Sequence, residues 1–410
     1  MQKRLLIIGF VWPEPNSSAA GSRMMQLISC FKSDDYSITF ASACTKTDHA
    51  FDLGSLGIEQ VTIVLNQSSF DDFIITLQPD VVLFDRFMTE EQYGWRVAQH
   101  CPDALRILDT EDLHCLRKGR QQAFKEQLPF DNSYLFNEIA KREIASIYRC
   151  DLSLIISEAE YELLTQVFKV EVSLLYYLPF LLKPVADSTI SNLPDFNERK
   201  HFVTIGNFLH PPNDQSILYL KHTIWPLIRK QLPQAELHIF GAYVSQKISQ
   251  LHNETQGFLV KGYVEDVAEV IQKARVCLAP LQFGAGLKGK LIDAMQNGTP
   301  SVMSSIAAEG MFGNMEASGS ITDDVHEFAN SAVTLYTHSS IWKEFQSNGF
   351  DIINTRFQHS DFQTDFLQLI KDLLTILKTH RQENFIGQML QHHHMQSTKF
   401  MSKWIEEKNK

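Results

Sequence analysis

The chain has 410 residues, 44% of them hydrophobic, and a formal net charge of −11 at pH 7. This length is natural for two domains, and the composition allows each of them a sizeable core. The negative charge argues against a protein that binds nucleic acid or anionic lipid by unspecific attraction. The six cysteines show no CxxC spacing, so we expect reduced thiols rather than a disulfide framework or a zinc site.

The N-terminus has a basic start followed by a short apolar run, residues 5–12. The run is short for a signal peptide and no small-residue cleavage site follows it directly, so a buried first strand is the better interpretation. No apolar stretch approaches the roughly 18 residues that a transmembrane helix requires. We therefore expect a cytoplasmic protein and leave peripheral membrane contact open.

Through the first half, short apolar runs alternate with longer amphipathic stretches. A helix is expected over residues 24–31. Strands are expected over residues 5–11, 37–43, 61–65, 81–84, 106–109 and 152–156. Continuous apolar strands separated by helices imply a parallel sheet that is covered on both faces.

Residues 182–200 lose this alternation and are rich in Pro, Ser, Asn and Asp, which is typical of a linker. The alternation then starts again. Strands are predicted over residues 202–206, 236–240, 258–261, 276–280 and 301–303, and helices over 217–230, 242–251, 267–273 and 291–296. Beyond about residue 340 the chain is expected to be helical, with an amphipathic helix over residues 362–377.

The predicted fold class is therefore α/β, with two doubly wound domains that face a central cleft. We place the N-terminal domain at residues 1–183, the linker at 184–200, the second domain at 201–345 and C-terminal helices and a tail at 346–410. We expect the C-terminal helices to pack back on the N-terminal domain. Ligands of such sheets bind at the carboxyl ends of the strands, so the cleft is the expected site.

The stretch LQFGAGLKGKLIDAMQNGTP, residues 281–300, lies between a predicted strand and a predicted helix. Its glycines allow a ligand to approach the backbone closely, and free N–H groups at a helix start favour an anion. Lys288 and Lys290 add full positive charges. Asp293 falls about one turn along the helix, where a carboxylate can accept two hydrogen bonds from a ribose diol. The pattern predicts a diphosphate site, and a glycine-rich turn with solvated lysines is the alternative.

From residue 202 to residue 310 the second half resembles the donor domain of GT-B glycosyltransferases of family 4, the glycosyl transferases group 1. The motifs that carry the resemblance are GNFLHPPN (206–213), LHIFG (237–241), GYVED (262–266), APLQFGAGLKGK (279–290), IDAM (292–295), GTPS (298–301) and AEG (308–310). Each motif alone is weak, but the ordered set is specific.

The resemblance implies a GT-B fold and the transfer of a sugar from a nucleotide-diphosphate sugar, UDP- or GDP-linked, to the hydroxyl of a glycan or other acceptor. It implies a hexosyltransferase, retaining by family default, acting in bacterial glycan or polysaccharide assembly without a bound cofactor or nucleic-acid partner. By resemblance, backbone groups of Gly262, Tyr263 and Val264 border the nucleobase, and Asp293 replaces the family's ribose-binding glutamate. The residues expected around the diphosphate are Gly284, Gly286, Leu287, Lys288 and Lys290.

The sequence departs from the family pattern at two places. Ala285 stands where many members carry a second glutamate, eight residues before the ribose-binding one. The basic pair often found in the donor-domain cleft is not evident in residues 207–210. A catalytically inactive nucleotide-sugar-binding subunit therefore stays an alternative, as does a GT-B epimerase or phosphorylase.

In the first half, Gly21, Ser22 and Arg23 lie at the start of the predicted helix over residues 24–31. In GT-B enzymes the comparable loop faces the cleft and helps to seat acceptor and phosphate. By resemblance, Arg23 meets a phosphate or an anionic acceptor. An ordinary capped helix with a surface arginine is the alternative.

Two polar clusters follow predicted strands, Asp85-Arg86 and the stretch DTEDLH at residues 109–114. Arg86 is expected to face the cleft. Asp112 and His114 are the predicted acid/base or sugar-contacting residues, because a histidine can donate to a hydroxyl or take a proton near neutral pH. A structural Asp–His pair is the alternative. Lys290 is the third predicted catalytic residue, since its charge would stabilise the departing diphosphate.

The neighbouring basic side chains and the carboxylates of DTEDLH raise two further questions. Arg117, Lys118 and Arg120 either face an acidic acceptor or face solvent, and we expect solvent. The carboxylates of DTEDLH are of the type that binds a divalent ion to a diphosphate. GT-B enzymes usually work without a catalytic metal, so we predict that there is none.

Overall fold

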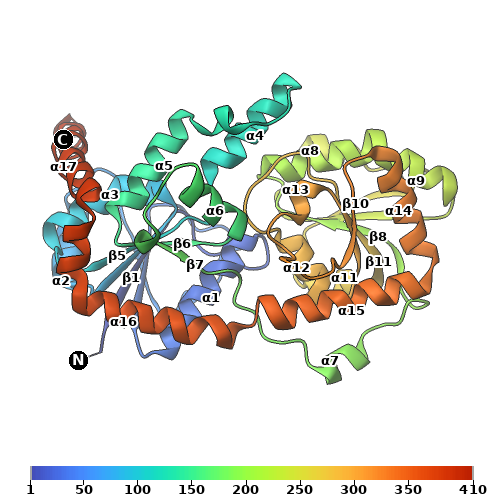
Figure 1. Ribbon diagram of the computed structural model, residues 1–410, viewed down its shortest axis with the longest axis horizontal. Helices are drawn as coiled ribbons and strands as arrows, with labels where there is room; N and C mark the ends of the chain where they lie inside the picture. The colour runs from blue at the N-terminus through green and yellow to red at the C-terminus, as the bar shows by residue number, and fades with distance from the viewer. Residues whose placement is uncertain (1, 409–410) are drawn as a thin grey trace.

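The computed structural model describes residues 2–408. Two α/β domains lie side by side, each built around a parallel sheet with helices on both of its faces (Figure 1). This architecture confirms the predicted fold class. The element bounds below follow the order of the chain in each domain.

The N-terminal sheet has seven parallel strands in the order β3-β2-β1-β4-β5-β6-β7. Its strands are β1 Arg4–Gly9, β2 Ser37–Ser42, β3 Glu59–Thr62, β4 Val81–Asp85, β5 Leu105–Asp109, β6 Leu152–Ile155 and β7 Leu175–Tyr177. Its helices are α1 Ala19–Ser33, α2 Ser69–Leu77, α3 Phe87–His100, α4 His114–Glu126, α5 Glu138–Arg149 and α6 Glu158–Gln166. The strand order reverses between β1 and β4, which is where doubly wound sheets open a crevice for a ligand.

Strand β1 shows why the sheet is covered on both faces. Leu5 and Ile7 belong to one buried apolar cluster, and Leu6 and Ile8 belong to another. Successive side chains of a strand point to opposite faces. Each face of this strand therefore lies in a core, as the continuous apolar run predicted.

The C-terminal sheet has six parallel strands in the order β10-β9-β8-β11-β12-β13. Its strands are β8 Lys200–Ile205, β9 Leu237–Phe240, β10 Phe258–Gly262, β11 Ala274–Ala279, β12 Ser301–Met303 and β13 Gly319–Ile321. Its helices are α8 Pro211–Tyr219, α9 Trp225–Gln231, α10 Gln246–Ser249, α11 Val267–Lys273, α12 Gly289–Gln296, α13 Ser305–Ala308 and α14 Val325–Thr337. A π-helical turn, Leu220–Ile224, joins α8 to α9.

The predicted strands are all present, with ends that differ by a few residues from the predicted ones. The helix predicted over residues 242–251 is wrong over most of its length, because only Gln246–Ser249 is helical. Tyr243 has a φ of +60°, a left-handed conformation that a right-handed helix does not admit. The sequence prediction also missed β7, β13 and the short helix α7, Asp187–Asn192, inside the linker segment.

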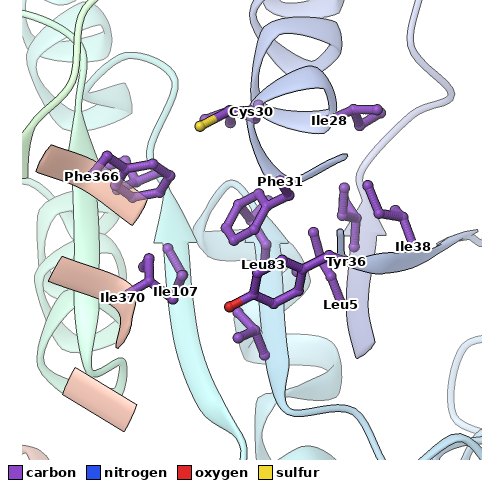
Figure 2. Close-up of a cluster of buried hydrophobic side chains, with 14 of the residues drawn as sticks. Leu5, Ile28, Cys30, Phe31, Tyr36, Ile38, Leu83, Ile107, Phe366 and Ile370 are labelled. Atoms are coloured by element: carbon purple, nitrogen blue, oxygen red, sulfur yellow. The ribbon is translucent and has the colours of Figure 1, made fainter. Parts of the chain in front are cut away.

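Three long helices end the chain, α15 Ser339–Arg356, α16 His359–Glu383 and α17 Phe385–Lys408. Helix α15 packs on α12 of the C-terminal domain, whereas α17 packs on α3 and α5 of the N-terminal domain. Helix α16 runs between them beneath the N-terminal domain (Figure 1). Its residues Phe366 and Ile370 lie in one buried cluster with Phe31 of α1 and Ile107 of β5 (Figure 2). Helices α16 and α17 thus pack on the N-terminal domain, and α16 completes one of its cores.

Candidate active site

A cleft of about 1060 Å³ lies between the two domains. Its walls come from both sheets, at the ends where their parallel strands finish. Arg86 follows β4 and Asp112 follows β5, while Asn207 follows β8 and Tyr263 follows β10. The loop after β11, residues 281–288, forms the centre of the C-terminal wall, and we call it the donor loop.

Two helix N-termini meet at the donor loop. Gly289 opens α12 and Ala19 opens α1 of the opposite domain. A Cβ on Gly289 would lie only 2.7 Å from the Cβ of Ala19, so this approach requires glycine at position 289. No side chain caps α12 at its first residue. The cleft therefore contains two converging positive helix ends, an arrangement that favours an anion.

Lys288 and Lys290 lie at the same point and are more than 90% buried. Lys290 Nζ donates a hydrogen bond to Asn213 Oδ1 at 2.9 Å. Lys288 Nζ donates to the carbonyl oxygens of Ala285 and Gly286. Burial lowers the pKa of both lysines to about 8. The hydrogen-bond partners of both ammonium groups are neutral carbonyl and amide oxygens, although the charges of Glu309 and Glu160 also act on Lys288.

Asp293 lies on the second turn of α12 and lines the cleft. Burial raises the pKa of its carboxyl to about 7. A carboxylate with this environment gains from hydrogen-bond donors that a ligand would bring. This is the placement that the sequence predicted for a ribose contact.

The residues predicted to border a nucleobase line the cleft only in part. Tyr263 and Val264 line the cleft, but Gly262 is not in its wall. Gly262 instead ends β10 with a φ of +82°, and its carbonyl accepts a hydrogen bond from Gly241 N–H. The imidazole of His49, from the N-terminal domain, packs against the Tyr263 ring with centroids 4.2 Å apart and ring planes tilted by 33°.

On the N-terminal wall, Asp112 and His114 both line the cleft, with His114 Nε2 3.4 Å from Asp112 Oδ1. Burial alone would raise the pKa of Asp112, but the charge of Arg117, with Nε 2.8 Å from Oδ2, lowers that pKa to about 2. Burial lowers the pKa of His114 to about 3. Near neutral pH Asp112 is thus a carboxylate and His114 is a neutral imidazole. Such a pair can form hydrogen bonds with a hydroxyl, and its histidine carries no positive charge.

The sequence analysis predicted that Arg23 lies in the cleft, and this prediction is wrong. Its side chain is 1% exposed, with Nε 3.0 Å from Asp109 Oδ1 and a further hydrogen bond to Leu178 O. The buried Asp109 carboxylate requires a cationic partner, and Arg23 supplies it. Arg23 is therefore committed to the interior and does not contact the cleft.

Gly21 and Ser22, which precede Arg23, lie in different environments from each other. Gly21 is buried, and a Cβ there would clash with the backbone of Glu14 at 2.3 Å. Ser22 lines the cleft, with its Oγ donating to Pro15 O. The glycine thus shapes the loop, and of this predicted group only Ser22 lines the cleft.

Arg86 lies in the cleft wall, as predicted, with a backbone φ of +70°. Glu111, on the neighbouring strand end, also lines the cleft and has a φ of +61°. Burial raises the pKa of Glu111 well above its ordinary value, and Asp109 adds to this effect. Two non-glycine residues in the left-handed region at one site mark stored strain, which is common where ligands bind.

The structure adds residues that no local pattern in the sequence marked as functional. Glu160 and Arg120 contact the donor loop from the N-terminal domain. Arg120 was expected in solvent, but it forms a bidentate ion pair with Glu309 of the C-terminal domain. Asn213 is part of a motif that the sequence singled out, but its hydrogen bond to Lys290 was not predicted.

Residues 2–408 contain no group of three or more His, Cys, Asp or Glu side chains that could hold a metal ion. Within the same residues, every helix is too short or too polar to cross a membrane.

Residues 199–338 match the family model described as "Glycosyl transferases group 1". A curated protein of Klebsiella pneumoniae, "Uncharacterized 44.6 kDa protein in cps region", is 25% identical over 160 residues. That match covers 37% of this chain and 41% of the other protein, so it spans about two fifths of the curated relative.

Solved structures resemble most of the chain, across both domains. Sucrose-phosphate synthase from Thermosynechococcus elongatus superposes with a TM-score of 0.66 at 18% identity, over 91% of this chain and 100% of that one. TarM of S. aureus, in a complex with UDP, gives 0.68 at 11% identity over 90% and 100%. HepE of Anabaena, in complex with UDP and glucose, gives 0.66 at 13% identity over 90% and 100%. The chain has the GT-B fold, and the part of it that matches the glycosyl transferases group 1 model lies in the C-terminal domain.

Proposed function

We propose that this protein is a glycosyltransferase that moves a sugar from a nucleotide-diphosphate sugar to an acceptor hydroxyl. One observation carries the proposal: two buried lysines and two converging helix N-termini lie at one point of the interdomain cleft. A diphosphate is the ligand whose charge and size match this arrangement.

The donor would occupy the C-terminal wall. Its diphosphate would lie against the start of α12, held by Lys288 and Lys290. The resemblance implied that Gly286 contacts the diphosphate. Its N–H instead donates to Glu160 and is therefore not free for a phosphate. Asp293 would accept hydrogen bonds from the ribose, and Tyr263 and Val264 would border the base.

Catalysis would rest on stabilising the departing diphosphate. Lys288, Lys290 and the helix ends supply positive charge where negative charge develops, which is usually the largest catalytic contribution in such sites. Closure of the domains would exclude water and protect the donor from hydrolysis. We propose that this occurs without a metal ion, and with retention at the transferred sugar.

The acceptor would bind along the N-terminal wall. Asp112 and the neutral His114 would position its hydroxyl, with Ser22 and Arg86 beside them. The solved structures of HepE with UDP and glucose and of TarM with UDP support a UDP-sugar as the donor. The matching protein from a cps region supports a role in bacterial glycan or polysaccharide assembly. Cytoplasmic location and peripheral membrane contact stay predictions.

A nucleotide-sugar-binding subunit without catalysis is the second candidate, and Ala285 favours it. This residue lines the cleft but offers no carboxylate to a donor sugar, and it packs into the apolar cluster of the N-terminal domain. The two candidates share the donor site and differ only in turnover.

Turnover of UDP- and GDP-sugars by the purified chain separates them. We expect release of the nucleoside diphosphate, faster with an acceptor glycan, and a fall of about ten-fold or more in the Lys290→Ala variant. The exposed Lys261 on β10 provides the control, because Lys261→Ala leaves the cleft intact. Binding of the donor without any turnover would favour the non-catalytic subunit.

A further inference from the structure

Glu160 links the donor loop to the N-terminal domain. It lies on α6, and its side chain is fully buried. Its Oε1 accepts a hydrogen bond from Gly286 N–H at 2.8 Å and another from Leu113 N–H at 3.0 Å. Leu113 stands between Asp112 and His114. One carboxyl oxygen of Glu160 therefore joins the donor loop to the segment that carries Asp112 and His114.

Arg120 contacts the same loop from α4. Its Nη1 donates to Gly284 O at 2.9 Å, and its Nη1 and Nη2 donate to the Glu309 carboxylate at 2.8 and 2.6 Å. One turn further along α4, the ring of Phe124 meets Phe283, with centroids 5.3 Å apart. The loop is thus held on both sides, its Gly284 carbonyl by Arg120 and its Gly286 N–H by Glu160.

We propose that Glu160 and Arg120 are positioning residues that set the conformation of the donor loop when the two domains close. The inference rests on the proposed function, because it concerns how the donor site is assembled. The residues that hold the loop belong to the acceptor domain, so the donor site is complete only in the closed arrangement. Affinity for the nucleotide is therefore controlled from the opposite domain.

The loop needs this support because its backbone is permissive. Gly286 has a φ of +65°, and a Cβ there would lie 2.9 Å from the Cβ of Asp112, so no other residue fits without strain. Glycine has no strong preference for one backbone conformation, and it loses more conformational entropy than any other residue when it becomes ordered. External hydrogen bonds to Gly284 and Gly286 are the direct way to fix such a segment.

The position of the loop also fixes Lys288. Its Nζ donates to the carbonyls of Ala285 and Gly286, within the segment that Glu160 and Arg120 hold. Movement of these carbonyls would carry the ammonium away from the start of α12. Loss of either positioning residue is thus expected to weaken the diphosphate site without removing any group that contacts the ligand.

The test is a calorimetric titration with UDP, or with GDP if the wild type prefers it, together with kcat and donor KM. Glu160→Ala removes the acceptor of both N–H bonds, and we expect a Kd and a donor KM raised about ten-fold or more. Glu160→Gln keeps a carbonyl oxygen at that position, so we expect it to stay within about three-fold of wild type. Arg120→Ala should act in the same direction as Glu160→Ala.

Exposed residues on the same helices provide matched controls. Glu162 lies on α6 and Lys125 on α4, both exposed, and we expect Glu162→Ala and Lys125→Ala to bind the nucleotide as wild type does. A Glu160→Ala protein that melts at a lower temperature but binds UDP normally would overturn the proposal, since its role would then be structural. Equal losses in Glu160→Ala and Glu160→Gln would also overturn it. If Glu160→Ala fails to fold, normal UDP binding by Arg120→Ala overturns it.

The wild-type titration separates this inference from the proposed function. A wild type that binds no nucleoside diphosphate contradicts the proposed function, and the positioning roles with it. A wild type that binds, with Arg120→Ala and Glu160→Ala binding equally well, contradicts only the positioning roles.

Discussion

Lys288 and Lys290 give the donor site a defined pH dependence, because burial lowers the pKa of both to about 8. Below pH 8 both are charged and attract a diphosphate. As the pH rises through 8 they lose their protons and that attraction falls. We therefore expect the Kd of the bound nucleoside diphosphate to rise about ten-fold or more between pH 7 and pH 9.5.

Calorimetry across this pH range measures that change. The Lys290→Arg variant keeps its charge throughout, since an arginine is always protonated, so its affinity should fall less steeply. An affinity that does not change up to pH 9.5 would contradict the role of these lysines.

We expect the Asp293 carboxylate to lower the stability of the folded protein, although it contributes to ligand binding. Burial raises the pKa of its carboxyl from 3.8 to about 7. Between these values the folded protein holds a proton that the unfolded chain has lost, so stability falls as the pH rises and the loss is complete above about pH 7. Asp293→Asn should therefore be more stable than wild type at pH 8, by at least about 1 kcal/mol.

The same variant should bind UDP less tightly, because an amide offers one acceptor oxygen where the carboxylate offers two. Pyrophosphate has no ribose and should bind equally well to wild type and to Asp293→Asn. Equal losses for UDP and pyrophosphate would place Asp293 at the phosphates and contradict the ribose contact. Urea denaturation at pH 5 and pH 8 measures the stability part.

Local sequence patterns predicted some site residues and not others. Lys288, Lys290 and Asp293 lie within one strand–loop–helix segment, where spacing alone brings them to the cleft. Glu160 lies 126 residues from Gly286 in sequence, so its contact depends on how the two domains meet. Arg23 lies in a loop whose sequence resembles a cleft loop, but its side chain binds the buried Asp109. No local motif reveals that Asp109 needs a cationic partner.

At the scale of elements, the contact between α1 and α12 allows the effect of domain closure on turnover to be measured apart from the stability of the fold. Gly289→Ala places a methyl group 2.7 Å from the Ala19 Cβ and should force the two helix ends apart. Alanine favours a helix by about 1 kcal/mol over glycine, so the C-terminal domain should stay folded. We expect turnover to fall about ten-fold or more with an unchanged melting temperature.

The double variant Gly289→Ala with Ala19→Gly is the control for that prediction. It removes the methyl group on the opposite side and restores the space, so turnover should recover. Failure of Ala19→Gly to rescue Gly289→Ala would show that the loss does not come from helix approach.

Elements with a strong local signal were predicted correctly. The buried strands are short continuous apolar runs, and α12 has an apolar face made by Leu291, Ile292 and Met295. The helix expected over residues 242–251 was wrong because its apolar periodicity could not reveal the left-handed backbone of Tyr243. Strands β7 and β13 have three residues each, too few to establish a period.

At the scale of the whole molecule, α16 makes the N-terminal domain depend on the C-terminal end of the chain. The ring of Phe366 is fully buried, and its centroid lies 5.6 Å from that of Phe31 (Figure 2). Phe366→Ala should destabilise the N-terminal domain by about 3–5 kcal/mol, through lost burial and the cavity left behind.

Urea denaturation followed by a probe in each domain measures this effect, since a two-domain chain need not unfold in one step. Ile376→Ala on the same helix is the control, because Ile376 is 52% exposed and should change stability by less than about 1 kcal/mol. A Phe366→Ala protein as stable as wild type would show that α16 is not part of this core.

The two-domain α/β organisation was predictable because each sheet rests on local apolar runs repeated along the chain. The return of the C-terminal helices to the N-terminal domain was expected, but the amphipathic pattern of α16 does not itself specify which core receives its apolar face. Its crossing is fixed by contacts such as Leu182 N–H to Phe357 O, between segments far apart in sequence.

A thermal-shift titration with UDP, GDP, CDP, ADP and NAD, with and without magnesium, tests the donor site most directly. A ligand that binds only the folded state adds about 2.7 kcal/mol of stability at a hundred-fold excess over its Kd. We expect one nucleoside diphosphate to raise the melting temperature, equally with and without magnesium, and Lys290→Ala to abolish the shift. No shift with any nucleoside diphosphate would contradict a working donor site in this cleft.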